Sequence, residues 1–340
     1  MLNNVPLTKL QFRPGIVREL TSYANEGGWF NCDKIRFRFG TPEKLGGWIK
    51  LSAATYLGSA RALKPFVALD GSHFNGVGTH LKYYVEEGGG YNDITPIRLT
   101  TSAGDVTFSA TNGSSTITVS DTAHGAIVND FVTFSGAASL GGNITAAVLN
   151  QEYQIASIVN DNSYTVAAKD TSGAAVTANS SDTGNGGSSV VGAYQINTGL
   201  DTTIAGTGWG AGLWGRGTWG SASSLIAIGS TLRLWSHDNF GEDLIINARD
   251  AGIFYWDKST GLSSRAVALS DRAGADSTTP TIAKQVLVSD RDRHVIVFGC
   301  DPENAIGTQD PLLIRFSDQE NPLVWQSLAT NTAGDLRIGS

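Results

Sequence analysis

The chain has 340 residues, which is enough for two or three domains with cores of their own. Only 16% of the residues are charged and the formal net charge is −7, which argues against a protein that grips nucleic acid through a basic face. The 41 glycines, together with frequent Ser, Thr and Val, favour short strands and tight turns over helices. The two cysteines, Cys32 and Cys300, are expected to be unpaired thiols.

No apolar stretch approaches the roughly 20 residues that a membrane-spanning helix needs. The first seven residues lack the basic start and the apolar core of a signal peptide. We therefore expect a soluble chain with no membrane span, made without classical secretion.

Residues 1–98 form a locally basic first segment. Within it, Ile35, Phe37 and Phe39 alternate with two arginines, which is the period of a half-exposed strand. We interpret this segment as the N-terminal part of a propeller-like platform that continues in residues 201–340.

The composition changes sharply after this first segment. Lys169 is the only basic residue between Arg98 and Arg216, and alternating runs of Thr, Val, Ile and aromatic residues are separated by turn signals. We interpret residues 99–200 as an inserted β-domain, a small sandwich or barrel. Its tail at 177–189 is rich in Ser and Gly and is expected to be a flexible loop or return linker.

Three tryptophans, Trp209, Trp214 and Trp219, follow the insert at intervals of five residues with glycines on both sides. Aromatic faces of this kind can stack on sugars, and they can equally pack a blade edge or a subunit interface. We take these three residues as a possible interface or glycan contact, with packing as the preferred interpretation.

Three segments, at 76–85, 244–256 and 294–317, share one pattern: an apolar strand, a break that contains Gly or Asp, and a second apolar or aromatic strand. Repetition of one small hairpin unit predicts an all-β fold of propeller-like repeated hairpins. A propeller needs at least four blades, so we expect that further chain or neighbouring subunits complete the ring.

Catalytic and metal-binding patterns are absent from the sequence. No two histidines stand at metal-ligand spacing, and the motifs of zinc sites, phosphate-binding loops and nucleophile elbows are missing. Paired carboxylates occur at Glu86–Glu87, Glu242–Asp243 and Asp290 with Asp292. We interpret these as charges of turns and rims, and predict no catalytic residue, no cofactor and no metal.

The segment Ser317–Trp325 loosely resembles the Asp-box of sialidase-type propellers, but it lacks the glycine and has a different spacing. In that family the box fastens a hairpin turn, so it does not imply catalysis. We expect the side chain of Asp318 to cap a turn.

Several stretches resemble one family. They are Leu10–Ile16, Gly28–Arg38, Pro42–Trp48, the run at 208–212, Trp235–Leu244 and the stretch at 316–338. Together these are similar to the nozzle class of short-tailed bacteriophages, also called tail tubular protein B or DNA-stabilisation protein. The resemblance covers about 1–98 and 200–340, and the insert looks like a module of the sort that decorates phage tail proteins.

This resemblance implies a structural virion protein without enzymatic activity. It implies a hexameric ring below the portal and adaptor, assembled in the host cytoplasm, that retains packaged DNA and conducts it during ejection. The implied partners are other copies of the chain, the tail adaptor protein, tail fibre or needle proteins, and double-stranded DNA in transit.

Two alternatives stay open at this point. A glycan- or receptor-binding tail module would use the insert or the tryptophan cluster as its contact surface. A propeller glycosidase would depend on a carboxylate such as Asp238 or Asp318.

Overall fold

The computed structural model describes residues 12–21, 23–47, 49–50, 52–182, 184–199 and 232–339. The chain divides into two compact units, Met1–Ala53 and Ala54–Ser340, so a division falls inside the segment 1–98. All pairings between the named strands are antiparallel, one isolated bridge between Ile16 and Trp29 is parallel, and the one α-helix of the described residues is α1 (Ala146–Leu149). The predicted all-β fold is therefore confirmed. No helix in the described part of the chain is long and apolar enough to cross a membrane.

The described residues of the first unit form a hairpin from β1 (Ile35–Arg38) and β2 (Thr41–Lys44). The predicted alternation holds along β1, where Ile35 and Phe37 are half-buried. Phe39, however, lies in the turn after the strand, with a positive φ of 50° and 95% of its surface exposed. The predicted alternation is wrong at this residue because the chain reverses there to pair with β2.

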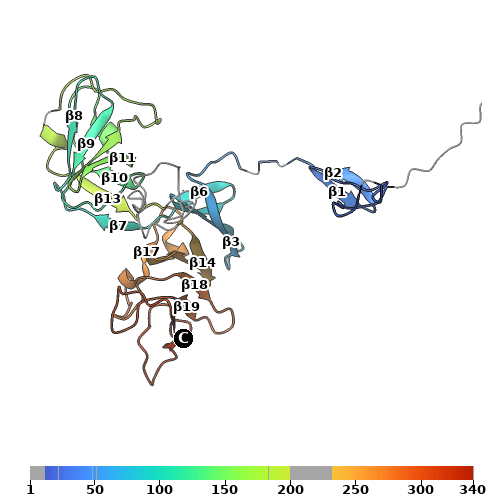
Figure 1. Ribbon diagram of the computed structural model, residues 1–340. Helices are drawn as coiled ribbons and strands as arrows, with labels where there is room; N and C mark the ends of the chain where they lie inside the picture. The colour runs from blue at the N-terminus through green and yellow to red at the C-terminus, as the bar shows by residue number, and fades with distance from the viewer. Residues whose placement is uncertain are drawn as a thin grey trace, which may run out of the picture. The chain divides into compact units, whose positions relative to one another are not determined.

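The part of the second unit that the structure describes includes three four-stranded sheets, each a simple meander, which we call blades 1 to 3 (Figure 1). Blade 1 consists of β3 (Ala60–Val67), β4 (His73–Thr79), β5 (Tyr83–Glu87) and β6 (Gly90–Asp93). Blade 2 consists of β14 (Trp235–Phe240), β15 (Asp243–Ala248), β16 (Ile253–Trp256) and β17 (Val267–Ala268). Blade 3 consists of β18 (Gln285–Val288), β19 (Val295–Phe298), β20 (Leu313–Phe316) and β21 (Gly334–Arg337).

The three blades pack face to face through two apolar cores. Leu244 and Ile246 point to one side of β15 and pack on blade 1 residues such as Tyr83. Ile245 points to the other side and packs on blade 3 residues such as Val297. Since successive side chains of a strand point to opposite faces, a strand between two sheets must be apolar at every position. This explains the uninterrupted run at 244–246.

Two glycines in β4 let blade 2 approach blade 1 closely. A Cβ atom at Gly78 would lie 2.5 Å from Cδ1 of Trp235, and one at Gly76 would lie 3.3 Å from Cδ2 of Leu244, both on blade 2. The indole of Trp235 uses this space and donates a hydrogen bond of 2.6 Å to the carbonyl of Thr79. Any larger residue at position 78 would push the two blades apart.

An inserted module lies between β6 and β14 in the chain (cyan to green in Figure 1). Its strands are β7 (Ile97–Thr100), β8 (Thr107–Ala110), β9 (Thr116–Ser120), β10 (Phe131–Ser135), β11 (Glu152–Asn160), β12 (Ser163–Ala167) and β13 (Val191–Gln195). They form one sheet in the order β7-β13-β10-β11-β12-β9-β8.

The sheet of this module folds over a core of its own. Phe108 lies on the edge strand β8 and Phe134 on β10, four strands away in the sheet order, yet their ring centroids are 4.9 Å apart. The sheet therefore curves so that its edge strand β8 and the interior strand β10 share core side chains, as in a small sandwich or barrel. Ala178 and Gly186, in the tail rich in Ser and Gly, are buried against this module.

Candidate functional site

The first strands of the three blades meet at a polar contact. The Nζ atom of Lys64 on β3 lies 2.5 Å from Oδ1 of Asp238 on β14, and both side chains are mostly buried. The other oxygen of Asp238 accepts a hydrogen bond of 2.9 Å from the backbone N–H of Val288 on β18. One carboxylate thus connects all three blades.

A serine next to this carboxylate strengthens the same contact. The hydroxyl of Ser236 accepts a 2.6 Å hydrogen bond from the N–H of Val286 and donates one of 3.0 Å to its carbonyl. These two bonds satisfy backbone groups of β18 that would otherwise be the unpaired edge of blade 3. Blades 2 and 3 are therefore joined by directional bonds as well as by apolar packing.

His237, between these two residues, pairs with a buried tyrosine of blade 1. Its Nδ1 atom shares a hydrogen bond with the hydroxyl of Tyr83, whose side chain is fully buried. Burial lowers the pKa of His237 to about 4, and the charge of Lys64 acts in the same direction. Burial also raises the pKa of Tyr83. Both side chains are therefore neutral at pH 7, and their contact fastens blade 1 to blade 2.

A cleft of about 680 Å³ opens at the edge of blades 1 and 2. Its floor includes Lys258, whose Nζ atom lies 2.7 Å from Asp70 and 3.1 Å from Glu242. The hydrogen bond from Lys258 is the main reason why the pKa of Asp70 falls to about 2. The guanidinium of Arg293 stacks at 5.4 Å over the ring of Phe240 on the same cleft.

The other carboxylates of the cleft also have partners. The hydroxyl of Tyr255 donates a hydrogen bond of 2.5 Å to Asp243, and Arg272 lies 3.0 Å from Asp257. The pair Glu242–Asp243 stands at the turn between β14 and β15, and both residues accept hydrogen bonds from backbone or side-chain donors. The cleft is thus a polar surface with two aromatic rings, in which each of these carboxylates has a structural contact.

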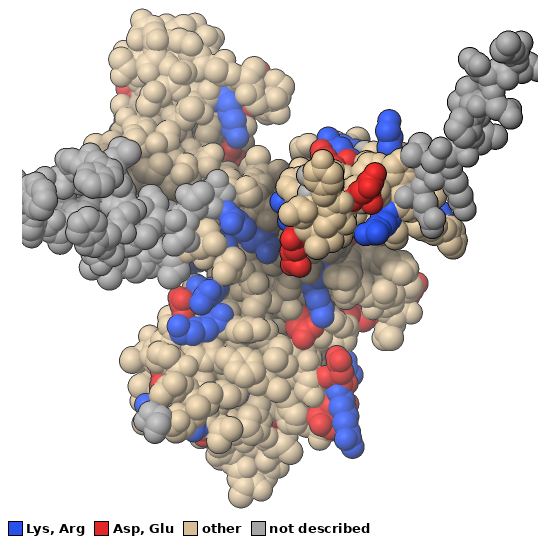
Figure 2. All heavy atoms as spheres, turned by 45° about the vertical axis from the view of Figure 1, so that its right-hand side comes forward, with Lys and Arg blue, Asp and Glu red and all other residues tan. Residues whose placement is uncertain are grey.

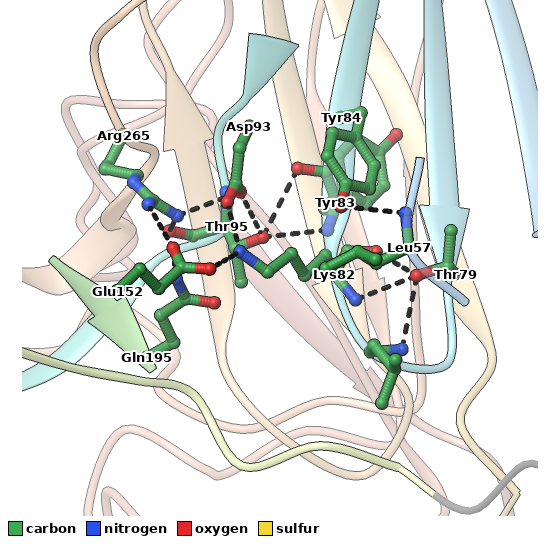
Figure 3. Close-up of polar contacts among 11 residues, drawn as sticks. Leu57, Thr79, Lys82, Tyr83, Tyr84, Asp93, Thr95, Glu152, Gln195 and Arg265 are labelled. Atoms are coloured by element: carbon green, nitrogen blue, oxygen red, sulfur yellow. Dashed lines mark hydrogen bonds and ion pairs between the residues drawn. The ribbon is translucent and has the colours of Figure 1, made fainter. Parts of the chain in front are cut away.

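An ion network fastens the inserted module to the blades, as Figure 3 shows. The buried Nζ atom of Lys82 lies 2.6 Å from Asp93 of β6 and also contacts Glu152 of β11. Arg265, which precedes β17, reaches the same two carboxylates at 2.8 and 3.4 Å. Gln195 of β13 donates a further hydrogen bond of 3.0 Å to Glu152. Two cations and two anions therefore alternate at the point where blade 1, blade 2 and the module meet.

The chemistry of this network favours the charged forms. Burial by itself would raise the pKa of Asp93, but the charges of Lys82 and Arg265 outweigh it and the pKa is lowered. The ammonium of Lys82 also lies 4.4 Å from the ring centroid of Phe131 in the module. The network is a structural fastener with satisfied partners on both sides.

The predicted site residues Trp209, Trp214 and Trp219 lie outside the described residues. Asp318 accepts hydrogen bonds of 2.9 and 2.7 Å from the backbone and hydroxyl of Thr332, so its side chain fastens two loops. Both cysteines are free thiols, as expected. Among the described residues, no group of three or more His, Cys, Asp and Glu side chains could hold a metal ion.

The contacts that join the blades and the module were not anticipated from the sequence. Lys64 with Asp238, and Lys82 with Glu152, lie far apart in the chain, and nothing in the local pattern links them. The one available signal was the sequence Gly76-Val77-Gly78, because glycines inside a strand often mark a close approach of another element.

Comparisons with known proteins are sparse. No family model matches the chain, and no curated protein matches it. Among solved structures, the phage phi92 endosialidase is similar at 14% identity, over 82% of this chain and 38% of that protein, with a TM-score of 0.23. The chain thus spans well under half of that protein's length.

Proposed function

We propose that the chain is a structural protein of a bacteriophage tail, of the nozzle class, which assembles into a ring in the host cytoplasm and becomes part of the virion. The ring retains packaged DNA and conducts it during ejection, without catalytic turnover. Its partners are further copies of the chain, expected as a hexamer, the tail adaptor, and tail fibre or needle proteins.

One observation carries this proposal: three blades in series are joined to one another by side chains of their first strands. Asp238 contacts both neighbouring blades, and Ser236 occupies the backbone edge of the third. The polar groups that catalysis would need are engaged here in holding sheets together. A scaffold of this kind suits a particle that must stay rigid under load.

The charge distribution supports a conduit for DNA. On the face drawn in Figure 2, uncharged atoms dominate and Lys and Arg lie beside Asp and Glu, with no single basic patch. Each phosphate that a basic wall neutralises adds a salt-dependent grip on DNA. A wall with net charge near zero or below lets duplex DNA pass without being held.

The ion network around Lys82 supports a fixed position for the inserted module. The buried ammonium of Lys82 contacts Asp93 of blade 1 and Glu152 of the module, and Arg265 next to blade 2 contacts Asp93 as well. A module attached only by flexible linkers would not need such a buried ionic contact. We infer that the module is a decoration held at a defined place on the ring.

The test is electron microscopy of the purified chain, with light scattering to give the mass in solution. Six-fold rings with a pore wide enough for duplex DNA are expected. A monomer at all concentrations, also in the presence of the tail adaptor, would exclude the nozzle.

A second candidate function is glycan binding, and the cleft at the edge of blades 1 and 2 is the observation that favours it. The half-buried ring of Phe240 lines the cleft, and Lys258 and Arg293 offer donors there beside carboxylates, which is a combination that suits sugar hydroxyls. Binding of host polysaccharide that Phe240→Ala abolishes would support a site in the cleft. Binding that is lost only in Trp214→Ala would place it on the tryptophan cluster instead.

A further inference from the structure

The outer face of blade 3 is apolar and has no covering sheet among the described residues. Strand register places Leu287, Ile296 and Phe316 in one row, and Phe298, Ile314 and Leu336 in the next. Leu312 and Ile338 extend this face past the strand ends, where the N–H of Ile338 bonds the carbonyl of Leu312. None of these eight residues is buried, and Leu336 and Ile338 are 61% and 52% exposed.

No charged side chain interrupts this face within the four strands. The remaining strand positions on the face are Gln285 and Gly334, while Arg315 and Asp335 point to the opposite side. A contiguous apolar surface of this breadth marks an interaction site in a folded protein. It cannot be the normal solvent face of a half-exposed sheet, which would alternate with polar side chains.

The chain itself shows what covers such a face. One face of blade 1, with Phe66 and Phe74, is covered by blade 2. The face of blade 2 that points away from blade 1, with Ile245 and Tyr255, is covered by blade 3. Each interface is thus sheet on sheet, with the first strands β3, β14 and β18 adjacent in turn. If the same sheet-on-sheet packing continues beyond blade 3, another sheet packs on its outer face.

Blade 1 carries the complementary surface. Leu63 and Val67 alternate with Phe66 along β3, so they point away from blade 2, and they are 62% and 54% exposed. Pro65 stands between them on the same face, and Pro is tolerated there because β3 is an edge strand. On this face Val77 and Tyr84 are buried, with Tyr56 packed on Tyr84, so the exposed apolar part of blade 1 is the row on β3. The two ends of the series therefore both expose apolar side chains, one row on β3 and one face on blade 3.

We propose that the outer face of blade 3 binds the exposed β3 row of blade 1 of a second copy of this chain. One contact of this kind covers both apolar faces and uses two different surfaces, so it is heterologous and closes into a ring when the rotation permits. This inference deepens the proposed function, since it identifies the surfaces by which the ring would assemble.

The test compares three exposed strand residues in the full chain. Leu336→Asp changes the blade 3 face, Leu63→Asp changes the blade 1 face, and Val159→Asp changes β11 of the inserted module, where the side chain is 57% exposed. Light scattering and electron microscopy report assembly, and circular dichroism reports folding. Each blade variant is expected to weaken assembly about tenfold or more, because a buried unpaired charge opposes association. Val159→Asp is expected to assemble normally.

Two further measurements make the contact specific. A variant pair that combines Leu336→Asp on one molecule with Leu63→Lys on another is expected to restore assembly, because opposite charges then face each other. In a Cys32→Ser background, Leu336→Cys and Leu63→Cys molecules are expected to be joined by a short bifunctional maleimide when mixed. Neither variant alone is expected to crosslink.

The outcomes separate the interface from the proposed function. Rings that survive both blade variants would overturn the interface while leaving the nozzle intact. If the wild-type chain stays monomeric and the thiol introduced by Leu336→Cys reacts freely with maleimide, both the interface and the nozzle are overturned. If the wild-type chain stays monomeric and this introduced thiol is protected, part of the same chain covers the face. A second copy is then not its occupant.

Discussion

The ammonium of Lys64 lies 2.5 Å from the carboxylate of Asp238, although the two residues belong to different blades and are separated by the whole inserted module. The same carboxylate accepts a hydrogen bond from the backbone of β18. The blades are therefore held in series by a polar contact at their first strands in addition to their apolar cores.

Replacing Asp238 with Ala is expected to lower the free energy of unfolding by about 2–4 kcal/mol, because it leaves Lys64 and the N–H of Val288 without their partner. Asp238→Asn is expected to cost less, since the amide oxygen can still accept the hydrogen bond. Urea denaturation of both variants measures this. Asp292→Asn, at an exposed pair with Arg291, is the control and is expected to change stability by less than about 0.5 kcal/mol. Equal effects at 238 and 292 would contradict the role of Asp238.

Replacing Gly78 with Ala is expected to destabilise the protein by about 1–3 kcal/mol, because the added methyl group would lie 2.5 Å from the indole of Trp235. The near-ultraviolet circular dichroism of the tryptophans is expected to change with it. Gly90→Ala in β6 is the matched control, since its nearest neighbour would be 3.5 Å away. If both variants behave alike, the close approach of the two blades is not the reason for the glycine.

Removing the charge of Lys82 with Lys82→Met is expected to cost about 3–5 kcal/mol, since Asp93 and Glu152 would then face each other with only Arg265 to balance them. Limited proteolysis is expected to cut between the blades and the inserted module more readily. Lys169→Met, inside the module, removes a charge without touching the network and serves as the control. Unchanged proteolysis in Lys82→Met would show that the network does not fasten the module.

Stability is expected to fall between pH 6.5 and pH 4 because of His237. Its pKa is about 4 in the folded protein and about 6.5 when unfolded, so the unfolded state binds more protons in this window. The contribution is fully present above pH 6.5 and is lost as the pH falls, to a limit of about 3 kcal/mol. Urea denaturation at pH 7 and pH 5 measures the difference.

The variant His237→Gln tests the assignment of this pH dependence. Glutamine keeps an acceptor for the hydroxyl of Tyr83 but does not titrate, so the loss between pH 7 and pH 5 is expected to shrink. His73→Gln, at an exposed position on β4, is expected to leave the pH dependence unchanged. A wild-type pH profile in His237→Gln would assign the effect to other groups.

The sequence alone was sufficient to predict the all-β class and the repeated hairpins. Runs such as 244–256 and 294–317 carry strand periodicity and turn residues in the same stretch of chain, and these local signals decide which segments pair with their neighbours. A hairpin depends on residues that are close in sequence, so its information is local. The prediction that the strand continues to Phe39 was wrong. The alternation of apolar and polar residues shows that a strand is present, but it does not show at which residue the strand ends and the turn begins.

The tertiary structure decided which faces meet and which groups become buried. Nothing near Lys82 in sequence indicates Glu152, and nothing near Lys64 indicates Asp238. Apolar character by itself also does not distinguish the covered face of blade 3 from the open one, since Val297 and Phe298 look equally fit for a core. Packing between sheets depends on residues far apart in the chain, and only their arrangement in space determines which apolar face stays open for another molecule.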